Sequence, residues 1–283
     1  MSSADSGTAG TPTPLLTEAL GAARKQLRIT EERGVATIEF TRPEKRNAIS
    51  FEMWEAFARV MPVLGADSDI DVVVLRGTPG GHFSSGADIS EFATLRSGIE
   101  GAHRYNDAVE AGERAIIDFP RPTIALVQGY AIGGGAQIAL ACDLRYCDDT
   151  ARFAITPAKL GLVYGLASTQ RLVETVGPAW ARWILFTGQQ LDASRAAAIG
   201  LVHDVLAPAD LTRTVYQTAE RMGGLARGSI EGAKALVAFS EDDGCSTSPA
   251  DLLNESILSN EYAEGIASFL GKRPADFHAA RTR

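Results

Sequence analysis

Short apolar runs, separated by polar or glycine-rich segments, recur along the first half of the chain. They are the alternating run Val35–Thr41 and the continuous runs Asp71–Arg76 and Thr123–Val127. Runs of this length that end at turn residues are typical of strands, and continuous runs are typical of strands buried on both faces. We therefore predict strands at these three places.

Between the first two runs, apolar residues recur at the spacing of a helix. Met53, Trp54, Phe57 and Val60 would share one face, and Ser50 precedes them where a capping hydroxyl is expected. The order strand, helix, strand, loop then returns further along the chain. Because strands that alternate with helices are joined by crossovers, this order predicts an α/β fold with a mainly parallel sheet.

Helical spacing dominates the chain after Gly165, where strand signals fade. The segments predicted as helices are Ser168–Val176, Ala179–Phe186, Asp192–Ile199, Pro208–Met222, Gly228–Phe239 and one long segment, Pro249–Leu270. Asp192 and Asp210 are expected to cap two of them. Since this helical region has no evident core of its own, we expect it to pack on a neighbouring subunit.

Composition narrows the classes of partner. The chain has 283 residues, 45% of them hydrophobic, and a formal net charge of −8, so a sizeable core is possible and a nucleic-acid partner is not expected. No stretch reaches the roughly 18 apolar residues that span a membrane, so no membrane partner is expected either. The polar start MSSADSGTAGTPTP lacks the pattern of a signal peptide and is predicted to be a disordered tail.

The cysteines point to a reducing compartment. There are three, Cys142, Cys147 and Cys245, and an odd, sparse count argues against a disulfide framework. Their spacing does not suit zinc, and no histidine pair accompanies them, so no metal site is expected. We predict a cytoplasmic protein in which Cys142 and Cys147 are small buried residues.

Two glycine-rich loops carry the candidate chemistry. His82–Ser90 reads HFSSGADIS and Gly129–Gln137 reads GYAIGGGAQ, and each follows an apolar run. The order strand, glycine turn, helix aims unpaired backbone N–H groups at whatever lies against the glycines. Two such donors that converge on one oxygen form an oxyanion hole. A dinucleotide site is disfavoured because the spacing does not match G-x-G-x-x-G.

Six ordered motifs make the chain similar to a known family. They are RPEKRNAIS (42–50), HFSSGADI (82–89), QGYAIGGGAQIALACDLRYC (128–147), ITPAKLGLVYGLASTQRL (155–172), SRAAAIGLV (194–202) and EGIASFLGKRPADF (264–277). The chain resembles the crotonase (enoyl-CoA hydratase/isomerase) superfamily from about Arg28 to Phe277. The resemblance implies a spiral of repeated ββα units, a C-terminal α-helical trimerisation region, and stabilisation of an acyl-CoA enolate.

The resemblance also implies boundaries and partners. Residues 1–27 would form a flexible tail and a short helix, residues 28–200 the acyl-CoA-binding core, and residues 201–283 the helical oligomerisation region. The protein would be a homotrimer or a dimer of trimers. The ligand would be an acyl-CoA substrate, and no separate cofactor is implied because coenzyme A is part of the substrate thioester.

Site residues follow by position in the motifs. Ala87 and Gly134 would donate the two N–H groups of the oxyanion hole. The residues implied to contact coenzyme A are Arg46, Ala48, Ala87, Asp88, Ile89 and, from a neighbouring subunit, Lys272, with Arg46 and Lys272 facing its phosphates. Asp88 is also expected to cap the helix that follows it.

The chain departs from the family at two positions that matter for chemistry. Hydratases of this family resemble one another in two glutamates, one two positions after the glycines and one twenty residues further on. Here Gln137 and Pro157 stand at these positions. Glutamine cannot exchange a proton near neutral pH, and proline has no polar side chain, so ordinary hydratase chemistry is disfavoured.

Decarboxylation of a malonyl-type or alkylmalonyl-type thioester is the first interpretation, because loss of CO₂ forms the enolate without a base. The segment TPAKLGLVYGL (156–166) resembles that of methylmalonyl-CoA decarboxylase, which implies that Tyr164 contacts the substrate carboxylate. Gln137 would contact the acyl group or a water, and Pro157 would keep the pocket apolar.

Two alternatives stay open. The first is a hydratase or isomerase with a relocated acid, for which Glu91, Asp107, Glu110 and Glu113 are the candidates, although a solvated helix face is the expected role of each. The second is a non-catalytic acyl-CoA-binding protein that kept the fold and lost both acids.

Overall fold

The computed structural model describes residues 13–240 and 248–282. Most of the predicted N-terminal tail, together with Cys245, lies outside the described residues. The chain begins with helix α1 (Pro14–Leu20), which packs on α2 (Phe51–Ala66) and buries Leu16 and Leu20 in the core. The predicted cap of α2 is confirmed, since the Ser50 hydroxyl accepts a hydrogen bond from the N–H of Met53 at 3.2 Å.

The larger of two sheets has six strands in the order β1-β2-β3-β4-β6-β9. Their bounds are β1 (Leu27–Glu32), β2 (Val35–Phe40), β3 (Val72–Gly77), β4 (Thr123–Val127), β6 (Leu144–Asp148) and β9 (Asp204–Leu206). Only β1 runs antiparallel to its neighbour, so the sheet is mainly parallel. The three predicted strands are confirmed as β2, β3 and β4.

A smaller sheet joins β5 (Tyr130–Ile132), β7 (Arg152–Ala154) and β8 (Leu191–Asp192). Successive ββα units place one strand in each sheet before a helix follows: β4 and β5 lead into α5 (Gly134–Ala141), and β6 and β7 lead into α6 (Leu166–Thr187). This repeated arrangement confirms the α/β spiral of ββα units.

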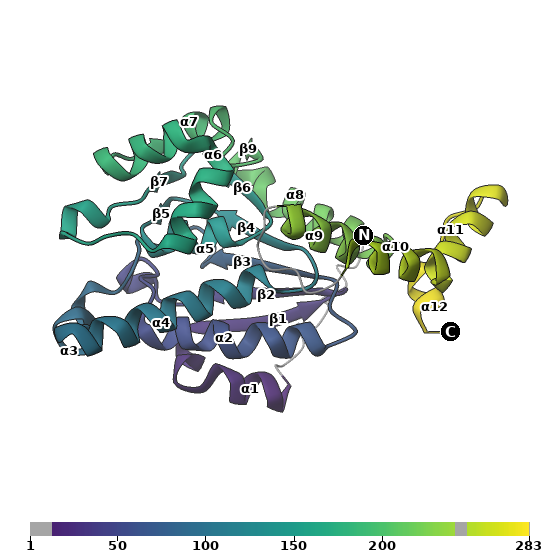
Figure 1. The fold of residues 1–283 in the computed structure, drawn as a ribbon, viewed down its shortest axis with the longest axis horizontal. Helices are drawn as coiled ribbons and strands as arrows, with labels where there is room; N and C mark the ends of the chain where they lie inside the picture. Colours follow the sequence, from purple (N-terminus) through teal and green to yellow (C-terminus); the bar gives the residue numbers. More distant parts are fainter. Residues whose placement is uncertain (1–12, 241–247, 283) are drawn as a thin grey trace, which may run out of the picture.

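Helices cover both faces of the six-stranded sheet. Figure 1 shows α2 and α4 (Gly98–Ile117) lying together along one face. On the other face, α8 (Pro208–Gly223) contacts β2, β3, β4 and β6. Side chains alternate along a strand, so β3 contributes to two clusters of buried apolar residues. Val73 and Leu75 join the main core on the α2 side, whereas Val72 and Val74 pack under α8. Coverage of both faces explains the continuous apolar runs.

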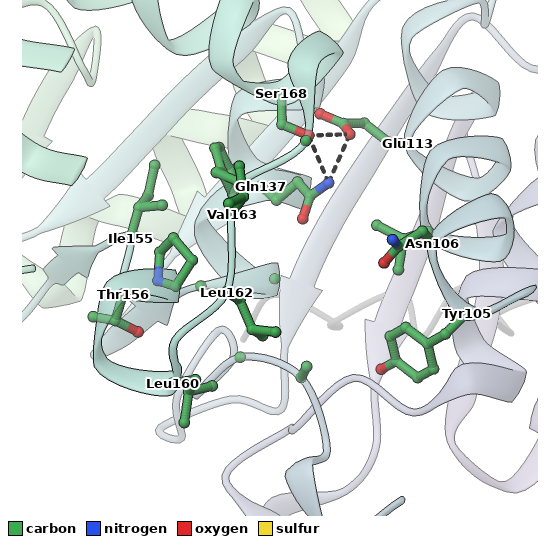
Figure 2. A pocket seen from close by; sticks show the side chains of 18 of the residues that line it. Tyr105, Asn106, Glu113, Gln137, Ile155, Thr156, Leu160, Leu162, Val163 and Ser168 are labelled. Carbon is green, nitrogen blue, oxygen red and sulfur yellow. Dashed lines mark hydrogen bonds between the residues drawn. The ribbon is translucent and has the colours of Figure 1, made fainter. Parts of the chain in front are cut away.

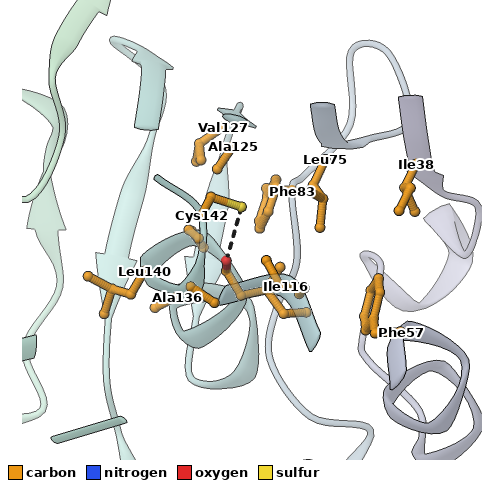
Figure 3. Packing of buried hydrophobic residues seen from close by; sticks show 14 of the residues in the cluster. Ile38, Phe57, Leu75, Phe83, Ile116, Ala125, Val127, Ala136, Leu140 and Cys142 are labelled. Carbon is orange, nitrogen blue, oxygen red and sulfur yellow. Dashed lines mark hydrogen bonds between the residues drawn. The ribbon is translucent and has the colours of Figure 1, made fainter. Parts of the chain in front are cut away.

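The main core lies between the six-stranded sheet and the helices α2, α4 and α5. Figure 3 shows Phe57, Leu75 and Phe83 packed beside Ile116, with Cys142 among them. Cys142 and Cys147 are both buried, as predicted, and the Cys142 thiol contacts the Ile138 carbonyl oxygen at 3.4 Å. This core anchors α4 and α5, two of the three helices that supply polar groups to the site.

The helical C-terminal third is largely as predicted. It contains α6, α7 (Ala193–Ala198), α8, α9 (Arg227–Ser240), α10 (Pro249–Leu258), α11 (Asn260–Leu270) and α12 (Phe277–Arg281). The two helices predicted within α6 meet at a kink where Gly177 has φ 75° and ψ 160°. Figure 1 shows α9 to α11 extending away from the sheet. Across the described ranges, no helix combines the length and the apolar character that a membrane span requires.

Three sequence predictions about this region are wrong. The long helix Pro249–Leu270 is broken at Ser259, which is extended (φ −76°, ψ 151°) and whose hydroxyl caps α11 by accepting from Tyr262 N. Asp192 caps α7 as expected, but Asp210 lies in the first turn of α8 and pairs with Arg213. The chain after Gly165 was also expected to be helical, but it contains two short strands, β8 and β9. They pair with β7 and β6, which lie earlier in the chain.

Candidate active site

One cavity of about 340 Å³ collects most of the predicted site residues. Its walls come from the loop around Gly86, from α4, from the start of α5 and from the segment between Ile155 and Ser168. Ala87, Gly134, Gln137, Pro157 and Tyr164 all line it, although they are spread over three separate motifs. The fold therefore brings together every residue that sequence reasoning assigned to catalysis.

The two predicted donors of the oxyanion hole lie against each other. Ile49 pairs with the Gly86 carbonyl and the Asp88 N–H, both at 2.8 Å, so the Ala87 N–H between them faces the opposite side. Gly134 is the first residue of α5, where the helix offers no acceptor for its N–H. A Cβ built on Gly134 would lie 3.4 Å from the Ala87 nitrogen. Both donors can thus reach one oxygen.

Glycines allow this close approach. Gly86 has φ 109° and Gly133 has φ 49°, conformations that other residues rarely adopt. A Cβ on Gly135 would lie 2.7 Å from the carbonyl oxygen of Ser84, so α5 begins directly against the strand-like segment that leads to Ala87. The positive end of the α5 dipole points at the same place, which favours negative charge there.

A carboxylate that sequence reasoning expected in solvent lies inside the cavity. Glu113 is 3% exposed, and its Oε2 accepts hydrogen bonds from Gln137 Nε2 and from the Ser168 hydroxyl, both at 2.7 Å. Gln137 Nε2 also donates to the Ser168 oxygen at 2.8 Å, which closes a triangle (Figure 2). The prediction that Glu113 lies on a solvated helix face is wrong.

Close packing of two helices explains why Glu113 points inward. A Cβ on Gly112 would lie 2.6 Å from the Trp54 carbonyl oxygen, so glycine lets α4 press against α2. Glu113 follows directly and faces α5 instead of water. The sequence held a signal for this, because Glu113 is four residues after Val109 and eight after Tyr105, both of which line the cavity.

Burial changes the ionisation of Glu113. Desolvation raises the pKa of its carboxyl above the ordinary value of 4.5, while the hydrogen bonds from Gln137 and Ser168 oppose that rise. A carboxyl with a raised pKa can exchange a proton closer to neutral pH than a solvated one can. Glu113 can thus exchange a proton, which Gln137 and Pro157 cannot do.

Gln137 and Pro157, which stand where the family carries glutamates, have no acid–base group and make other contacts here. Gln137 lies one turn into α5, with its amide nitrogen turned to Glu113 and, in Figure 2, its carbonyl oxygen on the side away from Glu113. Pro157 opens a short 3₁₀ turn (Pro157–Leu160) and lines the cavity without a polar group.

Tyr164 lies in the cavity wall beside Glu113. Its hydroxyl is buried and lies close enough to the Ser168 hydroxyl to interact with it. Burial, and after it the negative charge of Glu113, raises the pKa of the Tyr164 phenol. A substrate carboxylate held by Tyr164 would therefore share its surroundings with a second carboxylate, which is unfavourable.

The residues implied to contact coenzyme A are found in three different environments. Arg46 is exposed, and its carbonyl accepts from the N–H of Ser85, which lines the cavity. Ile89 is half exposed at 54% and lines the cavity, whereas Ala48 is buried and is not among the residues that line it. Lys272 follows α11, a helix that Figure 1 shows well away from α4 and α5, which line the cavity.

Asp88 holds the loop around Ala87 in place through its side chain. Its carboxylate accepts from Ser90 N as the predicted cap and pairs with Arg42 at 2.7 Å and Lys45 at 2.8 Å. Although burial alone would raise it, the hydrogen bonds from Lys45, Ser90 and Arg42 hold the pKa of Asp88 well below its usual range. This carboxylate is therefore an ionised anchor for the Ala87 loop.

The other acids considered as relocated catalysts differ from Glu113. Glu91 Oε2 accepts from Phe51 N at 2.8 Å, which ties the loop after Asp88 to α2. Asp107 and Glu110 are exposed on α4, as predicted, although Glu110 reaches the cavity rim. Among the four candidates, Glu113 alone combines burial with a contact to Gln137.

Comparison with known proteins agrees with this geometry. The chain belongs to the enoyl-CoA hydratase/isomerase family, whose model matches residues 30–280. The crotonase resemblance is thereby confirmed, and the protein is an acyl-CoA enzyme of that superfamily. The further resemblance to methylmalonyl-CoA decarboxylase stays a prediction.

Relatives cover nearly the whole chain. It is 30% identical to a short-chain-enoyl-CoA hydratase of Clostridium acetobutylicum over 87% of this chain and 95% of that protein. It is 29% identical to a crotonyl-CoA hydratase of Syntrophomonas wolfei, over 90% and 98%. A solved structure of an enoyl-CoA hydratase/carnithine racemase from Magnetospirillum magneticum superposes with a TM-score of 0.85 at 32% identity, covering 89% of this chain and 95% of that one.

Proposed function

We propose that this protein hydrates the double bond of an enoyl-CoA thioester and that Glu113 supplies the acid–base group. The observation that carries the proposal is the buried Glu113 carboxylate, 2.7 Å from the amide of Gln137 at the position of the family's first glutamate. The names of the relatives support hydration over decarboxylation.

The chemistry follows from the three groups around the cavity. The thioester oxygen accepts the N–H groups of Ala87 and Gly134, which stabilise the enolate as negative charge develops on that oxygen. A water held by the Gln137 carbonyl oxygen loses a proton to the Glu113 carboxylate while its oxygen bonds to Cβ. Glu113 then returns that proton to Cα, so one water is added across the double bond and the carboxylate is regenerated.

Isomerisation is the nearest related outcome, since a single carboxyl can also move a proton from Cγ to Cα. Decarboxylation remains a second candidate because Gln137 and Pro157 remove both usual acids. The position of Tyr164 beside Glu113 argues against it, since the leaving carboxylate would meet a buried anion.

We also propose that copies of this chain associate and that Arg46 and Lys272 face coenzyme A. Seven large apolar side chains of the C-terminal helices α10 and α11 are exposed: Leu253, Ile257, Leu258, Tyr262, Ile266, Phe269 and Leu270. Such a surface favours association with further copies of this chain, as a trimer or a dimer of trimers. Association would also let Lys272 approach the cavity of another copy, where it and Arg46 would face the phosphates.

A panel of thioesters incubated in D₂O and analysed by mass spectrometry tests the reaction type. Crotonyl-CoA is expected to gain the atoms of one D₂O, with deuterium at Cα, and methylmalonyl-CoA is expected to stay intact. Deuterium exchange without water addition would indicate isomerisation. Release of CO₂ from methylmalonyl-CoA, with crotonyl-CoA unchanged, would replace the proposal with decarboxylation, and binding without turnover would indicate a non-catalytic protein.

A further inference from the structure

Hydrogen-bond donors without acceptors gather in the cavity. Two residues that line the cavity have a buried side-chain donor with no hydrogen-bond partner among residues 13–240 and 248–282: Trp54 Nε1 and Tyr105 OH. The indole N–H can only donate, and burial raises the pKa of the Tyr105 phenol, so both offer a proton. A buried donor without an acceptor is destabilising, so both would be stabilised by an acceptor that a ligand brings.

The Tyr105 hydroxyl is the donor best placed to meet the acyl group. The residue is 2% exposed, and Figure 2 shows its oxygen directed into the cavity, opposite the wall that carries Thr156 and Leu160. The thioester oxygen is already served by Ala87 and Gly134. A plain alkyl chain would bring no acceptor to Tyr105.

A positive charge lies over the ring that carries this hydroxyl. The Arg96 guanidinium carbon stacks 5.5 Å from the Tyr105 ring centroid and 5.1 Å from that of Phe92. Arg96 Nη2 donates to the Asn106 side-chain oxygen at 2.9 Å. Among the described residues that line the cavity, Arg96 is the only basic one. Guanidinium and phenol donors together suit a carboxylate.

Two acids also lie close to Tyr105, and the charge of Glu91 acts on its phenol more strongly than that of Arg96 does. Asp88 is neutralised by Arg42 and Lys45. Glu91 accepts from Phe51 N, and burial raises the pKa of its carboxyl. Glu113 lies on the Gln137 side of the cavity, against Ser168. Both acids close to Tyr105 thus already have donors of their own, whereas the Tyr105 hydroxyl has no acceptor within the described ranges.

We propose that the preferred substrate is a dicarboxylic acyl-CoA, whose distal carboxylate is bound by the Tyr105 hydroxyl and the Arg96 guanidinium. This inference rests on the proposed enoyl-CoA function and adds the substrate class. Tyr105 and Arg96 are specificity-determining residues that contact the acyl end, while the reacting carbons lie between the oxyanion hole and Glu113. The carboxylate supplies the acceptor that the buried Tyr105 hydroxyl lacks in the described ranges.

Binding of saturated thioesters tests this inference separately from catalysis, because they have no double bond to hydrate. Succinyl-, glutaryl- and adipyl-CoA are compared with butanoyl-, pentanoyl- and hexanoyl-CoA by titration calorimetry. An apolar pocket would favour the alkyl member of every pair. In at least one pair, we expect the carboxylated member to bind more tightly than the alkyl member by about tenfold or more. An effect of this size is typical of hydrogen bonds to a charged group.

Three variants locate the effect. Arg96→Gln and Tyr105→Phe should each remove most of that preference while leaving the affinity for the alkyl thioesters within about twofold, a split that a general loss of structure would not produce. Arg104→Gln is the control. It removes the same charge as Arg96→Gln, but from the residue before Tyr105, whose guanidinium lies over Phe51 outside the cavity, and it should keep the preference. Alkyl preference in all pairs, or a carboxylate preference that both Arg96→Gln and Tyr105→Phe retain, would overturn the inference whatever the outcome of the hydration assay.

Discussion

Two neutral donors and, after them, the positive charge of Arg171 stabilise the ionised form of the Glu113 carboxylate. Desolvation favours its protonated form, whereas the Ser168 hydroxyl and the Gln137 amide favour the ionised form. As a general base, Glu113 must be ionised, so kcat/KM is expected to fall on the acidic side through a pKa above 4.5. Each donor therefore sets where on the pH scale the enzyme loses activity.

Replacing Ser168 by alanine removes one donor to that carboxylate. The ionised form then loses stabilisation, the pKa of Glu113 rises further, and the acidic limb of the kcat/KM profile moves to higher pH. Thr169→Ala is the matched control, since Thr169 lies next on α6 and its hydroxyl donates only to the Gly165 carbonyl. Superimposable profiles for Ser168→Ala and the wild type would show that Glu113 does not ionise during turnover.

At the level of elements, the oxyanion hole depends on how closely α5 approaches the segment that carries Ala87. Gly135→Ala would put a Cβ 2.7 Å from the Ser84 carbonyl oxygen and push the two donor N–H groups apart. Loss of one such donor costs about 10²–10³-fold in kcat, and we expect a loss of that order. The assay is kcat at saturating enoyl-CoA.

Gly232→Ala, in the middle of α9 with open space around it, is the control for this substitution. Alanine favours a helix interior by up to about 1 kcal/mol, so this variant should keep full activity and melt no lower than the wild type. Equal kcat for Gly135→Ala and Gly232→Ala would contradict the close approach.

Elements with strong local signals were predictable from the sequence. The apolar runs of β2, β3 and β4, the Ser50 cap and the glycine turn before α5 depend on neighbours along the chain. By contrast, β8 has only two residues and β9 three, and they become strands through pairing with β7 and β6. The Glu113 site was missed for the same reason, because its three members come from α4, α5 and α6 and meet only in the folded chain.

For the whole molecule, the exposed apolar side chains of α10 and α11 favour self-association. Phe269 is 83% exposed on α11, and an aspartate there would place a charge in any interface that buries this surface. Light scattering is expected to give a multiple of the chain mass for the wild type and a smaller assembly for Phe269→Asp. Leu15→Asp, on the exposed side of α1, should leave the mass unchanged. A monomeric wild type would contradict the expected assembly.

The most direct test of the proposed chemistry is the rate of enoyl-CoA hydration after Glu113→Gln, compared with Asp107→Asn. Both variants remove a carboxylate from α4, but Asp107 is exposed and outside the cavity. If Glu113 moves the proton, kcat should fall by about 10²–10⁴-fold in Glu113→Gln and stay within about twofold in Asp107→Asn. A Glu113→Gln enzyme that hydrates its substrate as fast as Asp107→Asn would contradict the relocation of the acid to Glu113.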